Sequence, residues 1–226
     1  MCAALCQVIN SVPVVEGVDD SYVWWPEPSG VYTVQSAYKL LRAHTLGAGD
    51  PVFSLVWDSA APSNVCGLIW RVILDQLQSK ANLRKRGVIH SDEEARCSLC
   101  LQEEESTSHL LLNCPRVASV WARCYRWLGT PTVLPYDCVS HLQQHVSLQL
   151  NSKQNQLFRV IWFAVVWMVW GRRNSVIFKG ASWVEDEVFD GIQMRVWFWL
   201  TGRVKGFGFS VYEWLSNPIL CLQSVA

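Results

Sequence analysis

Residues 97–114 read CSLCLQEEESTSHLLLNC and contain the pattern C-x2-C-x8-H-x4-C. Two cysteines separated by two residues can direct both thiolates from one tight turn toward a common centre, and the later histidine and cysteine can complete a tetrahedron. The pattern therefore predicts a Zn²⁺ site, because thiolate and imidazole ligands favour zinc over hard cations. Its ligands would be Cys97, Cys100, His109 and Cys114. The alternative is a chance spacing among nine Cys and five His.

The chemistry of the predicted site follows from its ligand count. Four protein ligands leave no open coordination position, so the site is expected to be structural rather than catalytic. Glu103 to Glu105 are interpreted as an exposed loop between the two ligand pairs. We expect the zinc segment to hold in place the helices that flank it.

Those flanking helices are predicted from their end signals. Ser79 can cap a short helix in KANLRKR, which Gly87 would end. Pro115 suits the first turn of a second helix, which Gly129 would close. The apolar positions of that second helix form a stripe: Val117, Val120, Trp121, Cys124, Trp127 and Leu128.

Farther from the zinc segment the elements are predicted from periodicity. Residues 31–34 (VYTV) read as a strand, and Ser36 as the N-cap of a helix that carries Tyr38, Leu40 and Leu41. One helical face is predicted before the zinc segment, at Trp70, Ile73, Leu74 and Leu77. In the last third, residues 157–170 form an apolar helix, and a second helix is spaced by Val188, Ile192, Val196 and Trp199. A third, short segment is expected around residues 212–215.

The predicted fold is mainly α with a short N-terminal β segment: a small zinc-stabilised helical domain followed by a Trp-rich helical tail. The expected division is an N-terminal segment at residues 1–21, the zinc-binding domain at 22–129 and a helical region at 130–226. The longest apolar run covers residues 160–170, which is too short for a membrane span of roughly 20 residues. We therefore expect no membrane association.

The charge balance limits any role in nucleic-acid binding. Nineteen basic and nineteen acidic residues cancel, so RNA or DNA would have to be bound by a local patch. One candidate patch is the basic run of Lys80, Arg84, Lys85 and Arg86. The alternative is a solvated helix face whose positive charges lie near the C-terminal end of the helix dipole.

Other titratable residues are interpreted as surface groups. Arg172 and Arg173 would flank an apolar helix, and His141 and His145 would form a surface pair. The start of the sequence, MCAALCQVIN, lacks a basic signal-peptide region, so a nuclear or cytoplasmic location is expected and secretion is not. No nucleophile–base set or carboxylate pair stands out, so we expect no enzyme activity and no small-molecule substrate.

Several motifs in this order resemble a known family. SGVYTVQSAY is followed by a W-x-x-x-AP segment, by IWRVILDQLQSKANLRKRGV and by the zinc segment with its trailing VW and WLG. This order over roughly residues 22–129 resembles the zinc-binding domain that follows the reverse transcriptase of plant LINE-type (non-LTR) retrotransposons. The resemblance implies that Cys97, Cys100, His109 and Cys114 are the zinc ligands. It further matches framework positions Trp57, Trp70 and Arg71 and a basic stretch at Leu83, Arg84, Arg86 and Gly87.

The resemblance implies a non-catalytic zinc-binding module, associated with nucleic acid in its ancestral context. Two positions depart from the family pattern: Asn64 stands where lysine is common, and Gln78-Ser79 stand where Pro-Thr is common. The missing lysine weakens the expectation of nucleic-acid binding. The alternative is a zinc-folded module that binds protein partners through the Trp-rich tail.

Overall fold

The computed structural model describes residues 22–33, 36–37, 40, 51–130, 133–146 and 152–225. The chain forms two compact units, residues 1–50 and residues 51–226. Helices dominate the described part of the chain, and its only ladder contact is an isolated bridge between Arg96 and Glu104. The zinc segment and its flanking helices belong to the second unit.

The predicted N-terminal β segment is wrong for the residues that the structure describes. Val31, Tyr32 and Thr33 have irregular backbone, because no neighbouring strand in the described residues offers a hydrogen-bonding ladder. The Thr33 hydroxyl instead accepts a hydrogen bond from the Ser36 amide at 3.1 Å. Thr33, three residues before Ser36, therefore has the role expected of the helix cap. Val34, Tyr38 and Leu41 lie outside the described residues.

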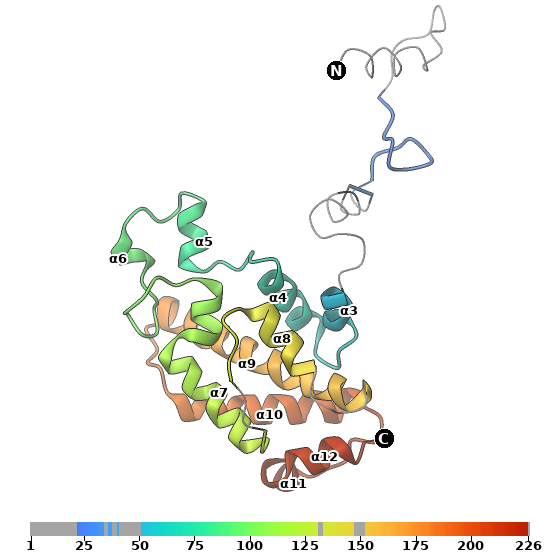
Figure 1. Ribbon diagram of the computed structural model, residues 1–226, viewed down its shortest axis with the longest axis vertical. Helices are drawn as coiled ribbons and strands as arrows, with labels where there is room; N and C mark the ends of the chain where they lie inside the picture. The colour runs from blue at the N-terminus through green and yellow to red at the C-terminus, as the bar shows by residue number, and fades with distance from the viewer. Residues whose placement is uncertain are drawn as a thin grey trace, which may run out of the picture. The chain divides into compact units, whose positions relative to one another are not determined.

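The second unit is built from helices in chain order (Figure 1). Before the zinc segment lie α3 (Pro51–Trp57), α4 (Ser63–Ile73), α5 (Lys80–Lys85) and α6 (Asp92–Ala95). The π-helix η1 (His109–Asn113) and α7 (Pro115–Trp127) complete that segment. After it come α8 (Cys138–Val146), α9 (Ser152–Lys179), α10 (Glu185–Arg203), α11 (Val211–Ser216) and α12 (Pro218–Gln223).

Helix α9 is the centre of this unit. It packs against α4, α8, α10, α12 and η1 (Figure 1). Residues 160–166 are all fully buried, so this stretch is apolar around its whole circumference, as expected of a core helix. The apolar run predicted at residues 157–170 is thus part of a longer helix. Within the described residues, no helix is long and apolar enough to cross a membrane.

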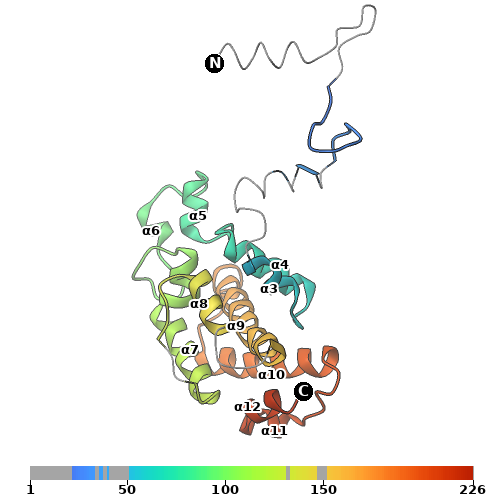
Figure 2. The ribbon, with the colours of Figure 1, turned by 45° about the vertical axis from the view of Figure 1, so that its right-hand side comes forward.

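One hydrophobic core joins the helices on both sides of the connection at residues 129–137. Trp121 of α7 and Trp162 of α9 belong to the same buried cluster as Val196 of α10. The predicted division into three segments stays a prediction, but packing is continuous across residue 130. In two views α5 and α6 lie at one end of this unit and α11 and α12 at the other (Figures 1 and 2).

Helix α4 buries a different face from the predicted one. Its buried positions Val65, Leu68, Ile69 and Val72 follow the i, i+3, i+4, i+7 spacing, but they lie on a different side of the helix from the predicted set. Leu77 is buried as well, but the helix has ended before it. The chain turns at Asp75, whose φ is 49°. Trp70 is half-buried and packs on Phe53 with ring centroids 4.6 Å apart.

The helices that flank the zinc segment begin and end as the sequence predicts. The Ser79 hydroxyl accepts a hydrogen bond from the Asn82 amide, which caps α5. After α5, Gly87 takes a φ of 70°, and its amide donates to the Arg84 carbonyl while the Val88 amide donates to Leu83. This is the Schellman arrangement, which favours glycine at that position.

Candidate metal centre

The first two predicted ligands lie in a short hairpin. The Cys97 amide donates to the Glu103 carbonyl at 2.7 Å, and the Leu101 amide donates back to the Cys97 carbonyl at 2.9 Å. Leu101 closes this turn with a φ of 61°, a left-handed conformation that is unusual for a residue with a side chain. The turn brings the sulfurs of Cys97 and Cys100 to the same side.

The other two predicted ligands are presented by η1 and the start of α7. In η1 the Cys114 amide donates to the His109 carbonyl at 2.7 Å, a bond five residues apart that widens the helical turn. Such single π turns are frequent at functional sites. Cys114 is the N-cap residue of α7 and so lies at the N-terminal end of that helix. The helix N-terminus thereby favours a thiolate at this position.

The structure brings all four predicted ligands together. One ligand atom from each of Cys97, Cys100, His109 and Cys114 lies within 4.8 Å of all the others. The Cys100 sulfur is 3.3 Å from His109 Nε2. Zinc bonds of about 2.0–2.3 Å place tetrahedral ligand atoms roughly 3.3–3.8 Å apart, so the cluster needs to contract only slightly to hold the ion. Three thiolates and one imidazole match the donor set of structural zinc sites.

The protonation of the cluster is coupled. The Cys97 pKa is raised to about 12, first because of a hydrogen bond between its thiol and the Cys114 sulfur and second because the thiol is buried. The pKa of Cys114 is lowered by the same bond. The His109 pKa is raised to about 9 by its bond to Cys97. Zinc has to displace protons from these groups, so its affinity should fall at acid pH.

Glu103 holds the remaining nitrogen of the histidine. Its Oε2 lies 3.1 Å from His109 Nδ1, which leaves Nε2 free to face the cysteines. A carboxylate on the far side of a ligand histidine fixes the ring and its tautomer and makes it a better ligand. The sequence predicts that Glu103 is an exposed loop residue. It is exposed, but no sequence pattern predicts its contact with His109, because that contact depends on how the hairpin folds.

The expectation of an exposed acidic loop is wrong for Glu105, and that of a surface charge is wrong for Arg173. The Glu105 side chain is 0% exposed and the Arg173 side chain 4%, and they form an ion pair. Glu105 also accepts hydrogen bonds from the amides of Lys80 at 3.2 Å and Ser98 at 3.1 Å. One carboxylate thus ties α5 and the cysteine turn to α9, because a buried charge needs several partners.

His141 is buried rather than part of a surface pair. Trp162 Nε1 donates to His141 Nδ1 at 3.1 Å, and His141 Nε2 lies 2.6 Å from the Tyr125 hydroxyl. An indole N–H only donates, so Nδ1 carries no proton and the neutral ring is protonated at Nε2. Burial lowers the His141 pKa to about 4. The side chain of His145 lies outside the described residues.

Three of the four residues of the predicted basic run contact other groups of the chain. Lys80 Nζ donates to the Arg96 carbonyl at 2.7 Å. Arg84 pairs with Asp92 at 2.7 Å, and Lys85 pairs with Asp75 at 3.4 Å. Arg86 is exposed and pairs with none of the described carboxylates. Two of the four positive charges in the run are therefore paired with acidic side chains.

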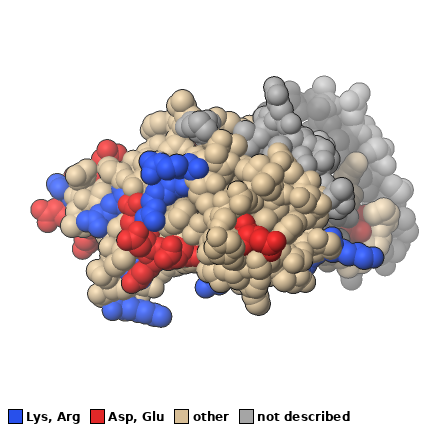
Figure 3. Space-filling model, turned by 90° about the horizontal axis from the view of Figure 1, so that it is seen from below, with Lys and Arg blue, Asp and Glu red and all other residues tan. Residues whose placement is uncertain are grey.

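The wider surface has the same mixed character. Figure 3 shows Lys and Arg side chains beside Asp and Glu side chains on one face of the molecule, with no continuous basic area on that face. This agrees with the zero net charge of the chain. Any nucleic-acid contact would need a small site in which a few cations lack acidic neighbours.

Comparison with known proteins supports the metal centre. Residues 32–121 match the family described as zinc-binding in reverse transcriptase, and this range includes all four candidate ligands. A protein of Arabidopsis thaliana, provisionally named a ribonuclease H protein, is 25% identical over 112 residues. The match covers 49% of this chain and 18% of the relative, so the chain spans less than a fifth of that protein. No solved structure matches the chain significantly.

Proposed function

We propose that this chain, which carries a zinc-binding domain of the reverse-transcriptase type over residues 32–121, is a non-catalytic, zinc-folded module derived from a retrotransposon that associates with RNA or DNA. The observation that carries the zinc assignment is the set of three cysteines and one histidine with ligand atoms within 4.8 Å of one another. The matched family is a zinc-binding domain and not a catalytic one.

The role of the metal is to fix the fold. With all four positions filled by protein atoms, zinc has no place for a reacting water, and it supplies cross-linking between the hairpin and η1. Cys97 and Cys100 hold it from the hairpin, while His109 and Cys114 hold it from η1 and the start of α7. Because such a site does not form in the unfolded chain, its binding free energy contributes to folding.

Metal content tests the zinc assignment. Elemental analysis of the purified chain should find one zinc per molecule, and Cys97→Ser and Cys114→Ser should lose both the metal and helical circular dichroism. Cys221→Ala is a matched control, because that buried thiol lies in α12, outside the cluster. Full helicity and an unchanged unfolding midpoint after chelation would overturn the assignment.

The association with nucleic acid is supported by the family match and by the basic run. Arg86 is the best probe, because Arg84 and Lys85 are already paired with acids. Reversing the charge at Arg84, Arg86 and Lys85 should weaken binding of labelled RNA. The salt slope, which is the steepness with which the logarithm of the binding constant falls with the logarithm of the salt concentration, should decrease by about 0.7 for each lost phosphate contact. If binding persists in the triple variant, the basic run is not the contact.

The alternative function is a zinc-folded module that binds proteins. It is favoured by apolar side chains exposed on the tail, such as Phe178, which is 76% exposed. This alternative predicts self-association or a protein partner together with no shift of labelled RNA at low salt. The zinc measurement does not separate the two functions, whereas the RNA titration does.

A further inference from the structure

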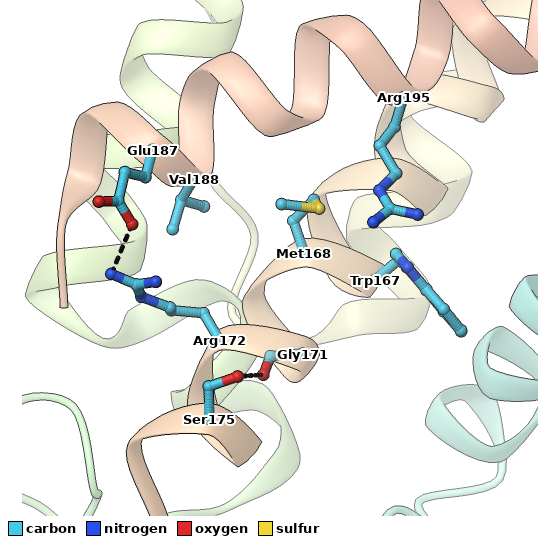
Figure 4. A pocket seen from close by; sticks show the side chains of 8 residues that line it. All are labelled: Trp167, Met168, Gly171, Arg172, Ser175, Glu187, Val188 and Arg195. Atoms are coloured by element: carbon cyan, nitrogen blue, oxygen red, sulfur yellow. Dashed lines mark hydrogen bonds and ion pairs between the residues drawn. The ribbon is translucent and has the colours of Figure 1, made fainter. Parts of the chain in front are cut away.

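Two hollows on α9 and α10 share one residue, Arg195. The first hollow is about 390 Å³ and lies between the two helices (Figure 4). The residues that line it include Trp167 and Arg172 of α9 and Glu187 and Arg195 of α10. The second hollow is about 310 Å³, and Met194, Trp197, Phe198 and Trp199 line it with Arg195. Both hollows lie after residue 121 and so outside the part of the chain that matches the family.

The first hollow has more positive than negative charge. Arg172 pairs with Glu187 at 2.8 Å, and this contact is visible in Figure 4. The Arg172 Nε is buried and donates to no acceptor among the described residues. Arg195 is exposed and has no ion pair with any carboxylate that the structure describes. Two guanidinium groups against one carboxylate, with donors left unused, favour an anionic ligand.

Aromatic side chains stand on both sides of Arg195. In Figure 4 its guanidinium group, carried by α10, points toward the Trp167 indole of α9. In the second hollow Phe198 is 71% exposed, and the Trp197 ring is held by a hydrogen bond from its Nε1 to the Phe209 carbonyl at 2.9 Å. The described surface thus has a cation between two hollows that each present an aromatic ring.

This alternation matches a single nucleic-acid strand, in which flat bases are joined by phosphates. Proteins that bind single strands stack bases on aromatic rings and contact the backbone with cations. A guanidinium group can donate two parallel hydrogen bonds to one phosphate. A duplex does not suit these hollows, because its bases are already stacked and paired. An apolar protein segment would leave the free donors of Arg172 and Arg195 without acceptors.

We propose that a short single strand of RNA or DNA binds across α9 and α10, with a phosphate on Arg195 and bases against Trp167 and Phe198. The inference rests on the proposed function, because the zinc-folded segment holds α9 in place through Glu105 and Arg173. It adds a contact surface that the basic run near α5 does not provide.

The test uses the zinc-loaded full chain and fluorescent strands of about eight nucleotides, a length within the range that small single-strand sites cover. Oligouridine and oligodeoxythymidine separate RNA from DNA, and inorganic polyphosphate competes as an anion without bases. Arg195→Gln should weaken binding and reduce the salt slope by about 0.7. Trp167→Ala should weaken binding roughly fivefold to a hundredfold, while Trp167→Phe retains most of it.

Arg126→Gln is the matched control, because Arg126 is an exposed arginine of α7 that lines neither hollow. Its affinity should equal that of the unmodified chain. Unchanged binding in both Arg195→Gln and Trp167→Ala overturns the proposal. The proposal is also overturned if polyphosphate displaces the strand equally well from the Trp167→Ala variant and from the unmodified chain. No binding of either strand by zinc-loaded protein also overturns it.

Zinc content and circular dichroism are measured on the same samples. A chain that folds without zinc and still binds strands through Arg195 and Trp167 contradicts the zinc part of the proposed function while it supports this surface. The opposite result is a chain that binds zinc and loses strand binding only when the charges of Arg84, Lys85 and Arg86 are reversed. That result supports the proposed function and contradicts the surface on α9 and α10. The two proposals therefore fail in different measurements.

Discussion

Glu105 and Arg173 form a buried ion pair although 68 residues separate them in the sequence. Glu105 follows the cysteine hairpin, and Arg173 lies in the last third of α9. The guanidinium group also lies over the Trp170 ring, 4.9 Å from its centroid. The pair therefore joins the zinc segment to the central helix through a contact that excludes water.

Removing one partner of this pair should be strongly destabilising. We expect Arg173→Met to lower the free energy of unfolding by about 3–5 kcal/mol, because Glu105 would remain buried without its cation. Chemical denaturation measures this change. The double variant Glu105→Gln/Arg173→Met should recover part of the loss, since no uncompensated charge is left.

The neighbouring arginine is the control for that prediction. Arg172 pairs with Glu187, whose side chain is 62% exposed, so Arg172→Met should cost less than about 1 kcal/mol. Equal losses in the two single variants would show that burial of the Glu105 pair has no special role.

Glu103 should tune the metal centre without being a ligand. Glu103→Gln removes the carboxylate beside His109 Nδ1 and should reduce zinc affinity about 10- to 100-fold, while the stoichiometry stays at one zinc. Competition with a chromophoric chelator measures the affinity. Glu104→Gln is a close control, because the Glu104 carboxylate lies 3.6 Å from the Arg84 guanidinium group. A Glu103→Gln variant with unchanged affinity would contradict the assignment.

His141 should make the fold sensitive to acid. Its pKa is about 4 in the fold against an ordinary value of 6.5, so the unfolded chain binds more protons between these two values. Stability is therefore complete above pH 6.5 and decreases as the pH falls toward 4. From the two pKa values, the loss between pH 7 and pH 5 should be about 2 kcal/mol.

Denaturation of the unmodified chain and of His141→Gln at the two pH values tests this. The acid release of zinc affects both proteins, so the difference between their pH slopes isolates the histidine. The slope should be smaller in the variant. Parallel slopes would show that His141 does not contribute.

Two glycines should respond oppositely to alanine. Gly87 has a φ of 70°, so Gly87→Ala should cost about 1 kcal/mol. Gly67 lies inside α4, and a Cβ there would meet no atom within 4 Å. Gly67→Ala should therefore stabilise the fold by up to about 1 kcal/mol, because alanine is the better helix former. Thermal unfolding of both variants gives the sign of each change.

The parts of this molecule that follow local rules could be predicted from the sequence. The four ligand residues are within 18 positions of one another, so their spacing alone indicates a common centre. The Ser79 cap, the Gly87 end and the Pro115 start depend on a few neighbouring residues. The positions Val188, Ile192, Val196 and Trp199 of α10 are all buried, as their period predicts.

The parts that depend on distant partners could not be predicted. Arg173 looks like a surface charge until the fold places Glu105 beside it. His141 looks exposed until Trp162 of α9 covers it. In α4 two apolar faces compete in the sequence, and only the packing against α9 selects the face of Val65 and Leu68. Residues 31–33 have strand-forming side chains, but a strand also needs a neighbouring strand to pair with, which no local pattern reveals.

The distance in sequence between Glu105 and Arg173 has a consequence during protein synthesis. The chain emerges from the ribosome N-terminus first, so all four metal ligands are available before Arg173 is made. At about 5–20 residues per second, the arginine follows Glu105 by roughly 3–14 s. In that interval the Glu105 carboxylate has to remain hydrated. A metal-loaded hairpin can exist before α9 supplies the arginine that neutralises this carboxylate. The nascent chain thus has its four candidate ligands available before the buried pair of Glu105 and Arg173 can form.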